Sequence, residues 1–243
     1  MKLSKIIEFL NKEIPQDLAL SNDNVGLMGS YDLTQEITSI KIFMDLFPQD
    51  DAYQNTTLII THHPPLFSPK TPTFTIHSNW DIIEGGANEA LADCLKLNVI
   101  ESFDKDTNIG RICEANLPYK DLKENILNNF NEYRIVNKPN ENKIIKRIAI
   151  ISGFGLKNPE YIKLAKKNNL DMIISGDLTQ ETTIMAINLD LTLIDLGHHN
   201  SEVPGLYYLK NLVDKLDVSC EIINKVPMES EKNERWWNTE NGR

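Results

Sequence analysis

Apolar positions along the chain fall into two alternating patterns, which together predict an α/β protein. Leu3, Ile6, Ile7 and Leu10 recur at helical spacing and predict a short amphipathic helix that Pro15 ends. Further stripes at this spacing predict helices in residues 87–97, 122–130, from 159 on, 178–188 and 207–216. Short runs rich in branched residues predict buried strands at residues 37–46, 58–61, 147–153, 171–176, 191–196 and 219–223.

The same patterns indicate two lobes. The polar stretch 137–143, which contains Pro139, is the best linker candidate. A strand that ends in a histidine pair occurs in each half of the chain, a weak echo that fits two related lobes with a shared cleft. We expect a first lobe over residues 1–115, a second over 116–226 and a polar tail over 227–243. Interleaving of the two lobes is left open.

Two predicted strands run directly into paired histidines. The run Leu58-Ile59-Ile60 leads to His62-His63 and the prolines after them, and residues 191–196 lead to Gly197-His198-His199. Ligands of open α/β sheets bind at such strand ends. The chain has five histidines, and the one outside the two pairs begins the segment His77-Ser-Asn-Trp-Asp81. Histidines and carboxylates at the ends of strands suggest a metal site.

Each of these residues also has a plainer interpretation. A lone histidine is more often a surface or core residue than a ligand, but two adjacent pairs favour ligands. His198 and Glu202 would share one face of a helical turn, a spacing that also occurs by chance. Asp81 is equally well a first-turn acid of a helix. Asp45, at the end of a strand, is more typical of a loop acid or a partner that holds a histidine.

Mixed imidazole and carboxylate donors suit zinc, manganese, iron or nickel. Two adjacent histidines on an irregular backbone rarely point at one ion, so two pairs and an acid favour two ions with a carboxylate between them. Such a pair, roughly 3.5–4 Å apart, activates water and stabilises the charge of a hydrolytic transition state. The alternative is a metal-binding module without turnover.

Three other stretches carry less chemistry. Four prolines in residues 64–72 predict an irregular loop that forms a wall or lid of the site. Gly153-Phe-Gly155 does not complete a dinucleotide fingerprint, and a plain turn is the better interpretation. Trp236-Trp237, in the polar tail, suits either a partner contact or packing on the protein's own surface.

Composition narrows the classes of protein. The chain of 243 residues is 41% hydrophobic and 25% charged, which is ordinary for a soluble globular protein. No apolar run approaches the ~18 residues of a membrane helix. Three dispersed cysteines favour a reduced, cytoplasmic protein. The formal charge of −10 argues against an extended nucleic-acid groove and leaves room for a local basic pocket.

Several segments, in this order, resemble one known family. They are Asp23-Asn-Val-Gly-Leu27, Ile60-Thr-His-His-Pro64, His77-Ser-Asn-Trp-Asp81, Gly85-Gly-Ala-Asn-Glu-Ala-Leu-Ala92, Ile109-Gly-Arg111, Ser152-Gly-Phe-Gly155, Ser175-Gly-Asp177 and Gly197-His-His-Asn-Ser-Glu202. The chain resembles the Nif-three-like family over residues 1–226. Members of this family are often labelled GTP cyclohydrolase 1 type 2 homologue or dinuclear metal centre protein.

The resemblance implies two α/β lobes with mixed sheets, a dinuclear metal cleft between them, and a toroidal homohexamer. It implies that His62, His63, Asp81, His198 and Glu202 are the ligands, with Glu202 bridging two divalent ions. His77 matches a candidate substrate or proton-transfer residue, and His199 stands behind the ligands. Trp80, where the family usually has leucine, is expected to reshape the pocket.

Two functions follow as expectations. The first is a cytoplasmic, two-metal hydrolase of a small nucleotide-like or phosphate-bearing substrate, with His77 relaying a proton. The second is a ring-shaped metal-binding scaffold or interaction protein without turnover. A nucleic-acid-binding ring is a weaker third hypothesis because of the acidic charge, and no membrane partner is expected.

Overall fold

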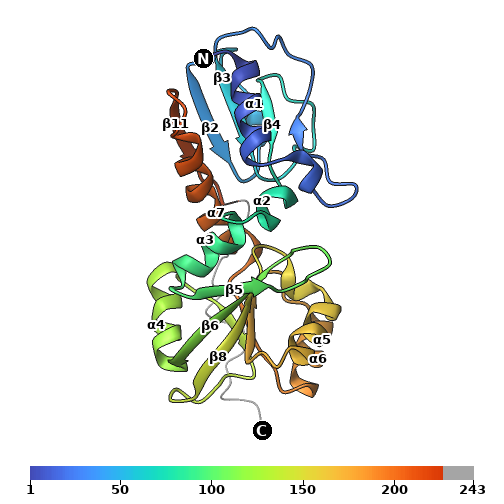
Figure 1. Ribbon diagram of the computed structural model, residues 1–243, viewed down its shortest axis with the longest axis vertical. Coiled ribbons are helices and arrows are strands. Elements are labelled where there is room, and N and C mark those ends of the chain that lie inside the picture. Colours follow the sequence, from blue (N-terminus) through green and yellow to red (C-terminus); the bar gives the residue numbers. More distant parts are fainter. Residues whose placement is uncertain (227–243) are drawn as a thin grey trace, which may run out of the picture.

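The computed structural model describes residues 1–226, and the predicted tail with Trp236-Trp237 lies outside the described residues. The molecule is elongated, with two lobes stacked along its long axis (Figure 1). Each lobe is built on one mixed β-sheet with helices packed against it. The predicted α/β class with two mixed-sheet lobes is therefore confirmed.

The first lobe contains a five-stranded sheet of order β1-β4-β3-β2-β11. Its strands are β1 (Gly26–Leu27), β2 (Ser39–Phe43), β3 (Thr57–Thr61), β4 (Thr73–Thr75) and β11 (Ser219–Ile223). Strands β4, β3, β2 and β11 pair in parallel, and only β1 pairs antiparallel. All five residues of β3 are buried, as expected for a central parallel strand.

The second lobe contains a six-stranded sheet of order β5-β6-β8-β9-β10-β7. Its strands are β5 (Asn98–Ser102), β6 (Arg111–Pro118), β7 (Arg134–Val136), β8 (Ile144–Ile150), β9 (Met172–Ser175) and β10 (Thr192–Asp195). The central strands β8, β9 and β10 run parallel, and antiparallel strands close both edges.

Helices cover the sheets unequally. They are α1 (Leu3–Glu13), α2 (Ser78–Ile82), α3 (Ala87–Cys94), α4 (Tyr119–Asn129), α5 (Pro159–Lys167), α6 (Gln180–Asn188) and α7 (His198–Val213), with short 3-10 turns at Gln16–Leu18, Pro48–Asp50 and Gly155–Lys157. In the second lobe α3 and α4 pack on one face and α5 and α6 on the other, as Figure 1 shows. In the first lobe α1 and α7 share one face, and loops cover the other.

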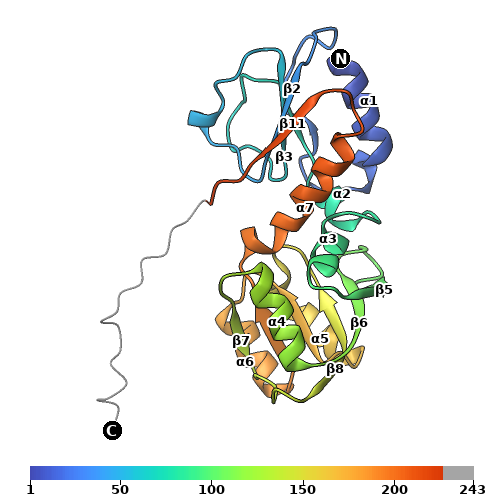
Figure 2. The same ribbon diagram turned by 90° about the vertical axis from the view of Figure 1, so that its left-hand side faces the viewer.

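Helix α7 ties the lobes together. It begins just after β10 of the second sheet and leads into β11 of the first, so it runs between the lobes (Figure 2). Its contact with α3 is close, because a Cβ atom on Gly205 would lie 2.8 Å from the Ala87 Cβ. Both helices therefore fix the relative position of the two sheets.

Sheet membership differs from the expected division of the chain. The boundary at residue 115/116 falls inside β6, and both β5 and β6 belong to the second sheet. In return β11, from the end of the described chain, completes the first sheet. The lobes are thus interleaved. The linker prediction at 137–143 was wrong, because that stretch joins β7 to β8 within one sheet.

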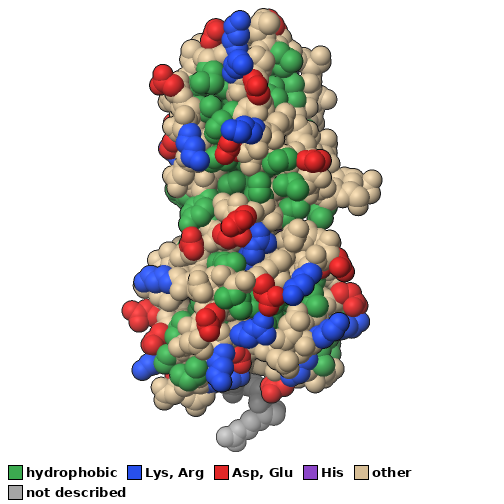
Figure 3. All heavy atoms as spheres, viewed as in Figure 1, with side chains coloured by type: hydrophobic (Ala, Val, Ile, Leu, Met, Phe, Trp, Pro, Cys, Tyr) green, Lys and Arg blue, Asp and Glu red, His purple; other side chains and the backbone are tan. Residues whose placement is uncertain are grey.

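Surface charge is mixed on the face that Figure 3 shows, where basic and acidic side chains are interspersed and apolar side chains gather at the waist. No helix in the described part of the chain is long and apolar enough to cross a membrane.

A buried arginine fastens the segment between α2 and α3 to the second sheet. Arg111, 6% exposed, donates to the backbone carbonyls of Ile82 (2.8 Å) and Ile83 (3.2 Å) and pairs with Glu89. It also donates to the carbonyls of Asn108 and Gly110. The Arg111 side chain therefore binds backbone carbonyls of the loop before β6 and of the segment between α2 and α3, and it also pairs with a carboxylate of α3.

We expect Arg111→Met to lower the free energy of unfolding by about 3–5 kcal/mol, because it leaves the Glu89 carboxylate buried without its cation. Lys105→Met, which removes an exposed ion pair with Glu101, should cost no more than about 1 kcal/mol. Urea unfolding followed by circular dichroism measures both. Equal losses in the two variants would contradict the assigned role of Arg111.

Candidate metal centre

The carboxyl ends of the parallel strands in both sheets supply the candidate site. Asp45 follows β2, His62 and His63 follow β3, and His77 follows β4. From the second sheet, Asp177 follows β9 and His198 follows β10. Parallel strands present these ends at one edge, where open α/β sheets bind ligands. The two such edges meet at the junction of the lobes.

Four histidines are each oriented by a hydrogen bond at their Nδ1 atom. The Nδ1 atom of His62 lies 3.0 Å from the Ile76 carbonyl, and that of His63 lies 2.8 Å from Asp45 Oδ1. Asp23 Oδ1 holds His77 Nδ1 at 2.8 Å, and Asp177 Oδ2 holds His198 Nδ1 at 2.9 Å. These oxygens only accept, so each Nδ1 donates its proton. A neutral imidazole held in this way carries its lone pair on Nε2, which is the arrangement of a metal-ligating histidine.

Three of these Nε2 atoms converge on the carboxylate of Glu202. His62 Nε2 lies 3.4 Å from Oε1 and His198 Nε2 lies 3.1 Å from the same oxygen. His63 Nε2 lies 3.2 Å from Oε2, and 3.3 Å from His198 Nε2. Glu202 is 3% exposed. One buried carboxylate therefore stands between histidines of both lobes.

Several buried polar atoms of this cluster have no hydrogen-bond partner. Asp81, 6% exposed, places Oδ1 3.7 Å from His62 Nε2. Seven side-chain atoms of the described residues are buried without a hydrogen-bond partner, and three of them, His62 Nε2, Asp81 Oδ1 and Glu202 Oε2, lie in this cluster. Such atoms are costly unless something binds them. Imidazole nitrogens and carboxylate oxygens that face one another are the donor set of a divalent cation, so the residues present fit a metal.

The close packing of imidazoles and carboxylates shifts their pKa values when no metal is bound. Burial opposes ionisation, but the imidazoles of His62, His198 and His63 hold the pKa of Glu202 well below its usual range. Contact with Glu202 is the main cause that raises the pKa of His198 to about 9. Burial raises the pKa of Asp81. The cluster without metal therefore retains protons on imidazoles, and a metal ion has to displace them.

The backbone around Glu202 is shaped to admit its carboxylate. Gly153 has φ +75°, and a Cβ there would lie 2.3 Å from Glu202 Oε1. Its N–H donates to Ser201 Oγ at 2.9 Å, and the Ser201 hydroxyl in turn lies 2.8 Å from the His198 carbonyl. The predicted turn Gly153-Phe-Gly155 thus supports the first turn of α7 and leaves space for Glu202.

The structure brings five predicted ligands, His62, His63, Asp81, His198 and Glu202, into one cluster. His77 also belongs to a group of possible metal ligands with His62 and His63. His199 does not join them, since its Nε2 lies 2.9 Å from Asn224 Oδ1. Asp45 contacts His63, which matches the interpretation of this acid as a partner that holds a histidine.

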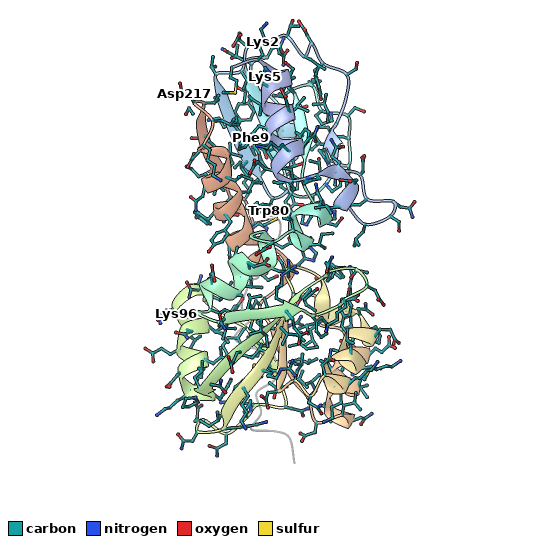
Figure 4. All side chains as sticks on the ribbon, in the orientation of Figure 1. Lys2, Lys5, Phe9, Trp80, Lys96 and Asp217 are labelled. Carbon is teal, nitrogen blue, oxygen red and sulfur yellow. The ribbon has the colours of Figure 1, made fainter. Side chains whose placement is uncertain are left out.

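Trp80 has a different environment from the one expected. It packs in the core of the first lobe at the junction with α7 (Figure 4), and its indole N–H lies 3.2 Å from the Gly205 carbonyl. Trp80 lines neither pocket that contains a cluster histidine, so these two pockets give no support to the expectation that it reshapes the pocket.

Two supporting acids, Asp23 and Asp177, were not singled out from the sequence. Each lies in a segment of the family resemblance, but nothing in those segments identifies its partner. Asp23 holds both His77 and the Ser78 N–H. Burial alone would raise the pKa of Asp23, but these hydrogen bonds hold it below its usual range. Asp177 was detectable only as a polar residue two positions beyond a buried strand.

Replacing Gly153 with alanine should displace the Glu202 carboxylate and weaken binding of Zn²⁺ by about tenfold or more, as loss of a ligand-orienting contact does. Gly85→Ala is a matched control, because Gly85 has φ +78° and nothing lies within 4 Å of the position that a Cβ would take there. Both variants bear the same backbone strain of about 1–2 kcal/mol. Competition with a chromogenic chelator measures affinity, and equal weakening in both variants would contradict the steric argument.

Comparison with known proteins agrees with this architecture. The chain matches the family model Duf34/NIF3 (NGG1p interacting factor 3) over residues 1–75 and 72–229. It is 38% identical over 225 residues to the GTP cyclohydrolase 1 type 2 homolog of Methanothermobacter thermautotrophicus, covering 92% of this chain and 93% of that protein. It is 30% identical over 254 residues to the protein of the same name from Clostridium perfringens, covering 92% and 95%.

Two solved structures have the same fold. Reduced HcgD from Methanocaldococcus jannaschii matches with a TM-score of 0.78 at 27% identity, over 91% of this chain and 97% of that one. The Staphylococcus aureus hypothetical protein SA1388 matches with a TM-score of 0.77 at 23% identity, over 95% and 99%. The resemblance carried by the sequence motifs is confirmed, and the chain belongs to the Duf34/NIF3 family.

Proposed function

We propose that the protein binds two divalent metal ions and uses them for hydrolysis. The convergence of three histidine Nε2 atoms on the buried Glu202 carboxylate carries this proposal. His62 and Asp81 would hold one ion and His63 and His198 the other. The Glu202 carboxylate faces the Nε2 atoms of His62, His63 and His198, so both ions would share it as a ligand.

The donors suit zinc, iron, manganese or nickel. When bound, such ions lower the pKa of water and stabilise negative charge in a hydrolytic transition state. The protein's own residues orient the ligands: Asp45 and Asp177 fix the rings of His63 and His198 through Nδ1. Asp23 fixes His77 in the same way, which leaves His77 Nε2 free to take up or deliver a proton at the reacting group.

The substrate we propose is small and nucleotide-like or phosphate-bearing. The names of the relatives support this, since those from Methanothermobacter and Clostridium are called homologs of a GTP cyclohydrolase. Two divalent ions beside the half-buried His77 would be suited to bind an anionic group of the substrate. We further propose that the protein acts in the cytoplasm as a ring-shaped homohexamer.

A metal-binding scaffold without turnover is the second candidate. The observation that favours it is the position of the cluster between the lobes, since ions bound by His62 and His198 would cross-link two sheets. In that function the metal would stabilise the assembled ring and would not take part in a reaction. The two candidates share the ligands and differ in what His77 does.

We expect close to two metal ions per chain after incubation with excess Zn²⁺, Mn²⁺, Fe²⁺ or Ni²⁺, each tested separately, and gel filtration. Glu202→Ala should retain less than about a tenth of the affinity, because it removes the carboxylate that faces all three Nε2 atoms. Inductively coupled plasma mass spectrometry measures the content. Glu124→Ala, on the surface of α4, is the control and should bind as the wild type does. Wild-type protein that retains no ion with any of the four metals would refute the dinuclear proposal.

His77→Gln should leave the metal content unchanged and lower turnover by about 10²–10⁴-fold, as loss of a general acid–base does. GTP, the other ribonucleoside triphosphates and bis(4-nitrophenyl) phosphate serve as substrates, with products identified by mass spectrometry. Loss of bound metal in His77→Gln would reassign His77 as a ligand. No turnover of any substrate by metal-loaded wild-type protein, together with a sedimentation mass near six chains, would favour the scaffold.

A further inference from the structure

A small apolar pocket lies directly beside the metal cluster and has no role in the proposal above. Its volume is about 260 Å³. Its lining residues come from the loops after β2 and β3 and are Asp45, Leu46, Phe47, Pro48, His63, Pro64, Pro65, Leu66 and Phe67. His63 belongs both to this pocket and to the cluster, so a ligand part bound here lies next to the proposed metal site.

The walls of this pocket contain few polar groups. Phe47, Phe67 and three prolines contribute rings, and prolines have no backbone N–H to donate. Phe67 is held from behind, since it packs on the small core of Phe43, Leu46 and Ile59. Among the described residues that line the pocket, the only ionisable groups are Asp45 and His63, which are bonded to each other. Such walls bind an apolar, planar group better than a charged one.

Leu66 extends this surface at the edge of the pocket. Its side chain is 101% exposed, although it is a large apolar residue in a loop stiffened by prolines. A ligand that covers Leu66 removes apolar surface from water, which favours binding. The predicted proline-rich wall of the site therefore offers exposed apolar surface that a ligand can cover.

The size and position of the pocket restrict its occupant. Pockets that enclose a whole drug-sized ligand have volumes of roughly 300–1,000 Å³, so this one takes a part of a substrate. A second pocket contains His198 of the cluster, together with Arg134, Asp177 and Asp195. That pocket carries both signs of charge, because Arg134 pairs with Asp195.

We propose that the pocket formed by Phe47, Phe67 and the prolines binds an aromatic ring of the substrate and holds the reacting group beside His63. This inference rests on the proposed function, whose substrate it narrows to molecules that carry a planar ring next to the hydrolysed group. An aliphatic or purely anionic substrate would leave these ring walls uncovered.

Indole is a suitable probe, because it is planar and apolar and lacks a metal-binding group. Cyclohexanol is the matched non-planar probe. Saturation-transfer difference NMR on the full-length purified protein should show indole binding and much weaker cyclohexanol binding. Leu66→Glu, a change at a fully exposed side chain that should not affect folding, and Phe47→Ala should each weaken indole binding by about tenfold, as loss of one ring or apolar contact does.

Ile187→Glu is the control, since Ile187 is a 55% exposed apolar residue of α6, in the second lobe. It should leave indole binding unchanged. Unchanged indole binding in both pocket variants, or cyclohexanol binding equal to that of indole, would overturn the proposal. The assay needs no turnover, so its result is independent of whether the protein proves to be a hydrolase.

Discussion

The buried carboxylate of Glu202 is the group on which the arrangement at the lobe junction depends. It faces Nε2 atoms of His62 and His63 from the first lobe and of His198 from α7. Burying a carboxylate costs several kcal/mol unless charges of opposite sign compensate it. In the metal-free protein only protonated imidazoles supply that charge, and they repel one another. Divalent ions would supply that charge and at the same time bind the Nε2 lone pairs, which is the physical reason to regard the cluster as a candidate metal centre.

This carboxylate can sit between the lobes only because rigid elements place it there. Helix α7 leaves the second sheet at β10, packs on α3 through Gly205, and ends in the first lobe. Arg111 fastens the carbonyls before α3 to the second sheet. Since the side chains of the cluster follow strands of two different sheets, small shifts at this junction would separate His62 from His198. The buried structure at the waist therefore determines the geometry of the site.

Much of this could be predicted from local sequence. The apolar runs at 58–61 and 191–196 correspond to β3 and β10, and the histidines directly after them, His62, His63 and His198, lie in the cluster. Asp45 also contacts a histidine, as one of its interpretations allowed. These predictions succeeded because a buried strand and the residue beyond it are both local features.

The failures all involve partners distant in sequence. The pairing of β11 with β2, and of β6 with β8, joins segments that are far apart in the sequence. The stretch 137–143 has the composition of a linker, yet it joins two strands of one sheet. Asp23 meets His77 across 54 residues, and Asp177 meets His198 across 21. No local pattern encodes such contacts. The shared use of Nδ1 by four histidines becomes visible only when their partners are in place. This shared geometry makes the cluster a candidate metal centre rather than a set of buried polar residues.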